Sequence, residues 1–180
     1  LTKFLPPTRG EILYRGQPIT SKKSNEIAQL GLVRSFQISA VFAHMTALEN
    51  VAVPLELAGD ADAFKKAQAE LEAVGLGKRM HHYPAQMSGG EQQRVAVARA
   101  LVVEPEILIA DEPTGNLDES TGAQIVDLMF SAQRDRKTTL VLVTHDPALA
   151  EKCDRVIRVR SGEIEETTQN LAATQEQVSA

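Results

Sequence analysis

Hydrophobic residues in the second half of the chain recur with two different periods. Residues 107–110 (Ile-Leu-Ile-Ala) form a short apolar run typical of a buried strand, and residues 138–144 form a longer β-branched and leucine run typical of a strand buried on both faces of a parallel sheet. Between them, apolar residues repeat at the spacing of one helix face: Ile125, Leu128, Met129 and Ala132. Alternation of buried strands and helices predicts an α/β fold with a mostly parallel sheet.

The first forty residues carry shorter patterns. Residues 11–19 predict two short strands around a turn at Arg15-Gly16, and residues 24–30 predict a short helix. Residues 32–36 predict a strand that leads directly into Gln37. A glutamine at such a position is ordinarily a hydrogen-bonding loop residue.

Two helices are predicted between residues 46 and 75. Thr46 and Glu49 have the spacing of a capping box, which opens a helix through about Leu57. Residues 60–74 predict a second helix, which Gly75 ends. The face of this second helix that we expect in the core is formed by Phe64, Ala67, Leu71 and Val74.

A further helix start contains paired glycines. Ser88 and Glu91 have capping-box spacing, so a helix begins there and runs to about Val102. Gly89 and Gly90 allow backbone N–H groups at this start to approach an anion closely, and the helix dipole favours negative charge there. Taken alone, such a motif is usually only a helix start.

Acidic and imidazole side chains follow the buried strands. Asp111 and Glu112 come directly after the strand at 107–110, a short turn then ends in Asp118, and His145 follows the strand at 138–144. Ligands bind at the carboxyl ends of strands in parallel sheets, so these side chains are candidates for chemistry. Each also has a plain structural reading, as a solvated strand end or a helix cap.

Composition restricts the class of protein. The chain has 180 residues, 43% hydrophobic and 24% charged, which suits one soluble domain with a sizeable core. The net charge of −5 offers no electrostatic case for nucleic acid as a partner. A single cysteine excludes an intrachain disulfide and suits a reducing compartment. We expect a cytoplasmic chain whose role at a membrane comes through a partner, and we expect the pair His81-His82 to pack at the surface, not to bind metal.

The order and spacing of residues 88–91, 107–112 and 115–118 resembles the ATP-binding cassette (ABC) family, with its signature motif, Walker B strand and D-loop. This resemblance implies a P-loop NTPase-like three-layer α/β core with an inserted α-helical subdomain. It divides the chain into an incomplete ATPase core (1–37 and 91–165), a helical subdomain leading into the signature motif (38–90) and a flexible tail (166–180).

The same resemblance implies roles for the candidate residues with ATP and Mg²⁺. Asp111, with Gln37, is expected to hold Mg²⁺, and Glu112 is the expected general base. His145 is expected to contact the γ-phosphate. The residues expected to meet ATP bound by a second subunit, in a head-to-tail dimer, are Ser88, Gly89, Gly90, Glu91 and Asp118.

The phosphate-binding P-loop of this family, G-x-x-x-x-G-K-[ST] or Walker A, does not occur in residues 1–180. Their only Gly-Lys pair, Gly77-Lys78, is followed by Arg79. We therefore expect these residues to lack the N-terminal strands of the core. Alone, they are expected to bind ATP poorly and to hydrolyse none detectably.

Subfamily features differ along the chain. From about residue 47 onward the sequence is similar to ATPases of the lipoprotein-release and macrolide-export type, and before that it looks more like branched-chain amino acid importers. The leading hypothesis is an ATPase subunit bound to transmembrane permease subunits at the inner face of the cell membrane. The alternatives are a branched-chain amino acid import ATPase, a non-transport ABC ATPase, and a truncated remnant without catalysis.

Overall fold

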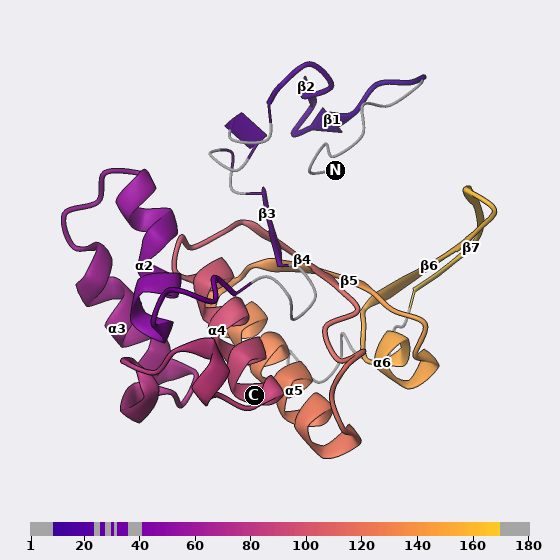
Figure 1. Ribbon diagram of the computed structural model, residues 1–180. Coiled ribbons are helices and arrows are strands. Elements are labelled where there is room, and N and C mark those ends of the chain that lie inside the picture. The colour runs from indigo at the N-terminus through magenta and orange to yellow at the C-terminus, as the bar shows by residue number, and fades with distance from the viewer. Residues whose placement is uncertain (1–8, 24–25, 28–29, 31, 36–40, 170–180) are drawn as a thin grey trace. The chain divides into compact units, whose positions relative to one another are not determined.

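The computed structural model describes residues 9–23, 26–27, 30, 32–35 and 41–169. Contacts divide the chain into two compact units, Leu1–Val141 and Leu142–Ala180, and each is described by itself. Figure 1 shows their strands and helices. None of the helices in the described part of the chain has the length and apolarity needed to cross a bilayer.

A three-stranded sheet organises the first unit, whose boundary at Val141 falls within the last strand. Its order is β3 (Leu32–Ser35), β4 (Ile107–Asp111) and β5 (Thr139–Val143). The first two strands are parallel, with Leu32 opposite Ile107 and Ser35 opposite Ala110. β4 is central and has a buried middle, as its apolar run predicts. The predicted strand at 32–36 is confirmed to Ser35, whereas Phe36 and Gln37 lie outside the described residues.

The prediction that residues 138–144 are buried on both faces is wrong. Exposed and half-buried residues alternate along β5, and the side chains of Val141 and Val143 are 38% and 50% exposed. β5 is an edge strand of the described sheet, and successive side chains of a strand point to opposite faces. The β-branched run therefore reflects strand propensity more than burial on two faces.

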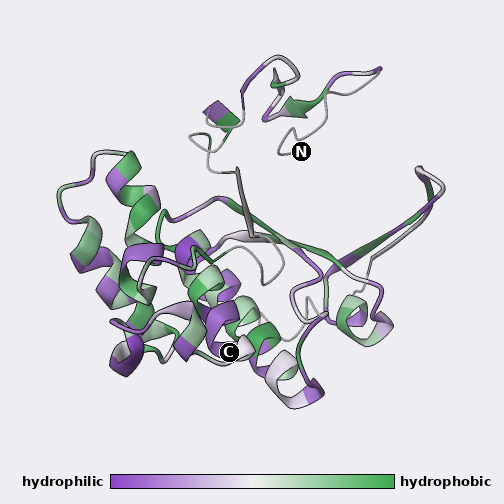
Figure 2. Ribbon diagram, viewed as in Figure 1, coloured by the Kyte–Doolittle hydropathy of each residue, from purple (hydrophilic) through white to green (hydrophobic). Residues whose placement is uncertain are grey.

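Three helices and two short 3₁₀ turns pack together beside the sheet. They are α2 (Ala47–Leu57), α3 (Ala63–Ala73), η2 (Gly77–Arg79), η3 (Pro84–Gln86) and α4 (Gly89–Leu101). Their buried aliphatic residues form one hydrophobic cluster, and green marks the hydrophobic residues of these helices in Figure 2. The capping box of α2 is confirmed: Thr46 N donates to Glu49 Oε2 at 2.7 Å, and Glu49 N donates to Thr46 Oγ1 at 3.3 Å.

Helix α3 differs from its prediction at the first turn. It begins at Ala63, and the side chain of Phe64, which we expected in the core, is 46% exposed. The buried stripe instead includes Ala63, Ala67 and Leu71, which are four residues apart. Phe64 lies one residue, about 100°, around the helix from this stripe. Gly75, with a φ of +76°, directly follows the helix cap as predicted.

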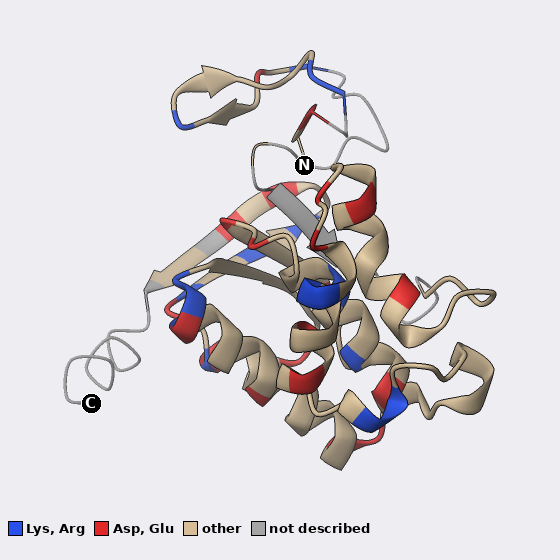
Figure 3. Cartoon of the chain, turned by 90° about the vertical axis from the view of Figure 1, so that its left-hand side faces the viewer, with Lys and Arg blue, Asp and Glu red and all other residues tan. Residues whose placement is uncertain are grey.

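Helix α5 (Glu119–Arg136) packs against α4 through the predicted face, with Ile125, Met129 and Ala132 buried. At its end, Arg136 Nη2 donates to both carboxylate oxygens of Glu70 at 2.7 and 2.9 Å. Arg136 Nη1 also donates to the carbonyl of Leu101 at 3.1 Å. One guanidinium thus joins α3, the end of α4 and the end of α5. Acidic and basic residues are interspersed on the described elements (Figure 3).

The N-terminal hairpin is confirmed. β1 (Leu13–Tyr14) and β2 (Gln17–Pro18) pair antiparallel, and Arg15 and Gly16 in the turn have φ values of 51° and 73°. The short helix predicted at 24–30 lies largely outside the described residues.

The second unit contains helix α6 (Pro147–Glu151) and a hairpin of β6 (Arg155–Arg160) and β7 (Glu163–Gln169). Asp146 caps α6 by accepting a hydrogen bond from Ala148 N at 2.9 Å. The hairpin turns at Ser161-Gly162, and β7 continues to Gln169, opposite Arg155. The prediction of a flexible tail from residue 166 is therefore wrong as far as Gln169, because residues up to Gln169 pair with β6 through the main chain. The division into ATPase core and helical subdomain stays a prediction.

Candidate nucleotide-binding site

The start of α4 has the capping box that the sequence predicts. Glu91 N donates to Ser88 Oγ at 3.2 Å, and Ser88 N donates to Glu91 Oε2 at 2.8 Å. Ser88 and Gly89 are exposed, whereas Gly90 is buried. The first amides of a helix have no partner within it, so an exposed glycine-containing start is suited to meet an anion.

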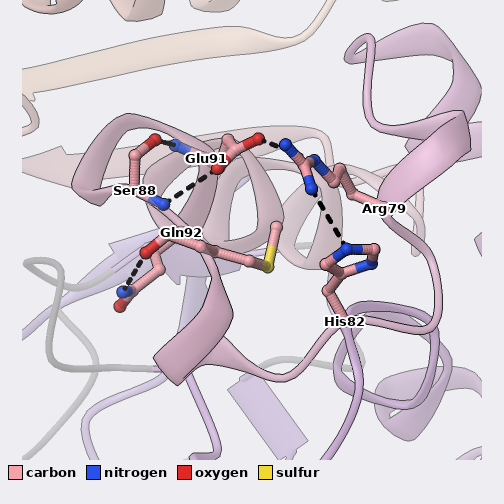
Figure 4. A network of polar contacts seen from close by, with 6 residues as sticks. Arg79, His82, Ser88, Glu91 and Gln92 are labelled. Carbon is pink, nitrogen blue, oxygen red and sulfur yellow. Dashed lines mark hydrogen bonds and ion pairs between the residues drawn. The ribbon is translucent and has the colours of Figure 1, made fainter.

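Arg79 and His82 extend this helix start into a polar network (Figure 4). Arg79 Nε lies 3.1 Å from Glu91 Oε1, and Arg79 Nη1 lies 3.0 Å from His82 Nε2. The hydrogen bond from Ser88 N, with smaller contributions from the Ser88 hydroxyl and Arg79, lowers the pKa of Glu91. Glu91 is therefore held as a carboxylate. Sequence reasoning did not single out Arg79, because neither residue type nor spacing marked it.

The starts of α4 and α5 are in close contact. A Cβ at Gly90 would overlap Thr121 Cγ2, whereas a Cβ at Gly89 would lie 3.6 Å from Leu117 Cδ2, which is ordinary van der Waals distance. Gly90 is thus required by helix packing. This constraint is separate from the phosphate contact that the motif implies.

Asp118 caps α5 at the end of the predicted turn. Its Oδ1 accepts hydrogen bonds from Thr121 N at 3.0 Å and Ser120 Oγ at 2.8 Å. Hydrogen bonds from Thr121, followed by that from Ser120, lower the pKa of Asp118 to about 2. The side chain is exposed and carries a full negative charge at neutral pH.

The carboxylates at the end of β4 occupy an irregular backbone. Asp111 is the last residue of the strand, and both Asp111 and Glu112 are half-buried. Glu112 has a φ of 47°, a left-handed conformation that is uncommon for a residue with a side chain. Gly115 N donates to the Glu112 carbonyl at 3.2 Å, closing a turn beneath the carboxylate. Adjacent residues within a strand point to opposite faces of the sheet. Because the chain turns at Glu112, the side chains of Asp111 and Glu112 need not do so.

Two candidate residues are not placed with this group. Gln37 lies outside the described residues, and His145 belongs to the second unit, where it is exposed. The structure therefore describes Ser88–Glu91, Asp111, Glu112 and Asp118 within the first unit.

Carboxylate oxygens at the end of β4 suit Mg²⁺, which proteins commonly hold with one or two carboxylates while substrate phosphates and water complete the coordination. Asp111 fits this description. Within the described ranges, no group of three or more His, Cys, Asp and Glu residues is arranged to hold a metal ion by itself. A magnesium site at Asp111 would accordingly depend on phosphate oxygens.

A helix start suited to a phosphate, together with two acids at the carboxyl end of a strand in a parallel sheet, is consistent with nucleotide binding by an α/β protein. A family model described as "ABC transporter" matches residues 1–115 of the chain. The chain therefore belongs to the ABC transporter family, among its ATP-binding subunits.

Curated relatives agree with this family. An "Uncharacterized ABC transporter ATP-binding protein YbbA" of Escherichia coli (strain K12) is 48% identical over 164 residues, covering 87% of this chain and 71% of that protein. A "Lipoprotein-releasing system ATP-binding protein LolD" of Syntrophus aciditrophicus (strain SB) is 45% identical over 165 residues, covering 88% of this chain and 73% of that protein.

Solved structures confirm the predicted fold class. The structure titled "Dimeric Structure of MJ0796, a Bacterial ABC Transporter Cassette" is 34% identical with a TM-score of 0.79, covering 91% of this chain and 75% of that one. A post-hydrolysis dimer of the same cassette, bound to ADP and Pi, has a TM-score of 0.77, 33% identity and the same coverage.

Proposed function

We propose that the chain is the ATP-hydrolysing subunit of a transporter of the lipoprotein-release type, coupling ATP hydrolysis to transport by a membrane permease. The observation that carries hydrolysis is the half-buried pair Asp111 and Glu112, placed where β4 ends and the backbone turns. Relatives named as lipoprotein-releasing ATP-binding proteins support the transport class at 44–52% identity. Their matches span both halves of the chain, which favours this type over branched-chain amino acid import.

The two acids divide the chemistry. Asp111 would hold Mg²⁺, which when bound neutralises charge on the nucleotide phosphates. Glu112 would accept a proton from the attacking water as general base. Gln37 would orient water and metal, and His145 would contact the γ-phosphate. The last two roles rest on the family resemblance alone.

The exposed start of α4 would act on a nucleotide held by another subunit. Gly89, exposed in the first turn of α4, presents its helical amide to solvent, where the helix dipole and an N–H group without a partner inside the helix favour a phosphate. Dimeric structures of a related cassette support a pair of subunits, and the head-to-tail arrangement rests on the family resemblance. Asp118, exposed at the adjacent start of α5, would lie at the same interface.

Permease subunits would anchor the protein at the cytoplasmic face of the membrane as a peripheral subunit. The net charge of −5 offers no surface potential that would attract nucleic acid, so a role in DNA repair or translation is not favoured. Co-purification with a permease would support the transport function, whereas co-purification with nucleic acid would support a non-transport ABC ATPase.

Glu112→Gln tests the proposed catalysis in a loop-extended protein, defined as residues 1–180 preceded by a segment that carries the G-x-x-x-x-G-K-[ST] loop expected of this family. We expect hydrolysis to fall by about 10²–10⁴-fold, as for loss of a general base, while ATP binding remains. Glu56→Gln, an exposed glutamate on α2, is the matched control and should hydrolyse normally. Normal turnover by the Glu112→Gln protein would refute the assignment of the base.

A further inference from the structure

We propose that Arg79 is a positioning residue for the start of α4, where it holds the Glu91 carboxylate against Ser88 and offsets its negative charge. This inference rests on the proposed function, in which Ser88 and Gly89 meet a phosphate of ATP bound by a second subunit. It adds to that function a residue outside the helix start and a reason for its presence.

The two oxygens of Glu91 have different partners. Oε2 accepts the hydrogen bond from Ser88 N at 2.8 Å, while Oε1 lies 3.1 Å from Arg79 Nε. Figure 4 shows the carboxylate between Ser88 on one side and Arg79 on the other. Holding one oxygen fixes the rotation of the carboxylate. The other oxygen therefore stays on the Ser88 amide.

Arg79 is itself held from its far side. A guanidinium has only donors, so His82 Nε2 accepts from Arg79 Nη1 in their 3.0 Å contact. The backbone of this segment is tied to α2: Leu48 N donates to Met80 O and Ala47 N donates to His82 O, each at 2.9 Å. A continuous set of hydrogen bonds thus runs from the first turn of α2, through Arg79, to the first turn of α4.

Charge gives this arrangement a functional consequence. Glu91 places a carboxylate three residues into a helix start that is proposed to receive a phosphate, and like charges repel. Arg79 supplies a compensating cation directly on that carboxylate. The side chains of Arg79 and Glu91 are 46% and 26% exposed, so the pair is partly screened by solvent and its effect is moderate.

The first experiment measures ATP-driven dimerisation by light scattering, in the loop-extended protein carrying Glu112→Gln to prevent turnover. Arg79→Met should raise the ATP concentration for half-maximal dimerisation by about fivefold, which corresponds to about 1 kcal/mol. For Arg79→Lys this ATP concentration should lie between those of the parent protein and of Arg79→Met, because lysine keeps the positive charge but lacks the planar guanidinium. Arg94→Met removes a different arginine, which lies on α4 and donates to Gln124, and this variant should match the parent protein.

The discriminating variant is the double substitution Arg79→Met with Glu91→Gln. A glutamine at this position still completes a capping box but carries no charge to offset. We therefore expect the double variant to dimerise as Glu91→Gln does alone. If Arg79→Met weakens dimerisation equally in both backgrounds, Arg79 acts through general structure and the proposal is overturned.

A second measurement separates this proposal from the proposed function. Amide exchange at Ser88 in the nucleotide-free protein should accelerate by about fivefold in Arg79→Met and not in Arg94→Met. An unchanged exchange rate at Ser88 overturns the positioning role of Arg79, regardless of the result of the dimerisation experiment. Accelerated exchange supports that role, and if the parent protein then fails to dimerise with ATP, it is the proposed function that fails.

Discussion

Neighbouring glycines at the start of α4 are under different constraints. A methyl group at Gly90 would overlap Thr121 Cγ2, whereas one at Gly89 has ordinary van der Waals room beside Leu117. We expect Gly90→Ala to destabilise the protein by about 1–3 kcal/mol through overpacking, and Gly89→Ala to change stability by less than about 0.5 kcal/mol. Urea denaturation measures both. Thr121→Ser, which removes the obstructing methyl group, should recover much of the Gly90→Ala loss, and absence of recovery would contradict the packing explanation.

Ser88 tests the phosphate contact at the same helix start. Ser88→Arg should block ATP-driven dimerisation of the loop-extended Glu112→Gln protein, because the long side chain fills the space in front of the first helical amides. Light scattering with and without Mg-ATP measures this. Dimer formation at the parent level would count against the contact of Ser88 with ATP in a second subunit.

The lowered pKa of Asp118 at the start of α5 predicts that the stability of the fold depends on pH. Its pKa is lowered to about 2 from the usual 3.8 by hydrogen bonds from Thr121 and Ser120. A lowered folded-state pKa means that the ionised cap stabilises the fold above pH 3.8, and that this contribution is lost as pH falls through about 2. Asp118→Ala should therefore be less stable than the parent at pH 5, with the difference shrinking between pH 4 and pH 2. A difference that stays constant across this range would exclude the cap as its source.

At the scale of elements, the guanidinium of Arg136 joins three helices through Glu70 and the Leu101 carbonyl. Glu70 is buried and Arg136 is exposed, so removing the arginine leaves a carboxylate without its cation in the interior. Arg136→Met should cost about 2–4 kcal/mol of unfolding free energy. The double variant Arg136→Met with Glu70→Leu should recover most of this, which chemical denaturation would show. A double variant no more stable than Arg136→Met would locate the cost elsewhere.

Local sequence signals predicted where helices and turns occur better than they predicted which residues are buried. The structure has the predicted capping boxes at Thr46 and Ser88 and the predicted turn at Arg15-Gly16, all of which depend on residues close in sequence. Exposure of Phe64 and of β5 depends on neighbours distant in sequence, and there the predictions were wrong.

At the site, Asp111 and Glu112 were identified as candidates because they are acids that directly follow a buried strand. The left-handed backbone of Glu112 and the contact of Gly90 with Thr121 follow from tertiary structure. No sequence pattern marked Arg79, because its partner Glu91 is twelve residues away across an irregular segment.

For the molecule as a whole, we expect residues 1–180 by themselves to bind Mg-ATP poorly and to hydrolyse none detectably. The G-x-x-x-x-G-K-[ST] loop that grips the β- and γ-phosphates is not among these residues. Charge-assisted hydrogen bonds contribute about 1.5–3 kcal/mol each, and micromolar affinity corresponds to about 8 kcal/mol, so several missing contacts remove such binding. Isothermal titration with Mg-ATP measures it. Micromolar binding by the 180-residue chain would show that other residues hold the phosphates.

The contact between Gly90 and Thr121 also has a mechanical consequence. Protein interiors have low compressibility, and no gap separates the first turns of α4 and α5 at this point. A displacement of one first turn is therefore passed on to the other instead of being absorbed between them. A push at Ser88 would in this way reach the start of α5 that Asp118 caps, and a push at Asp118 would reach the start of α4.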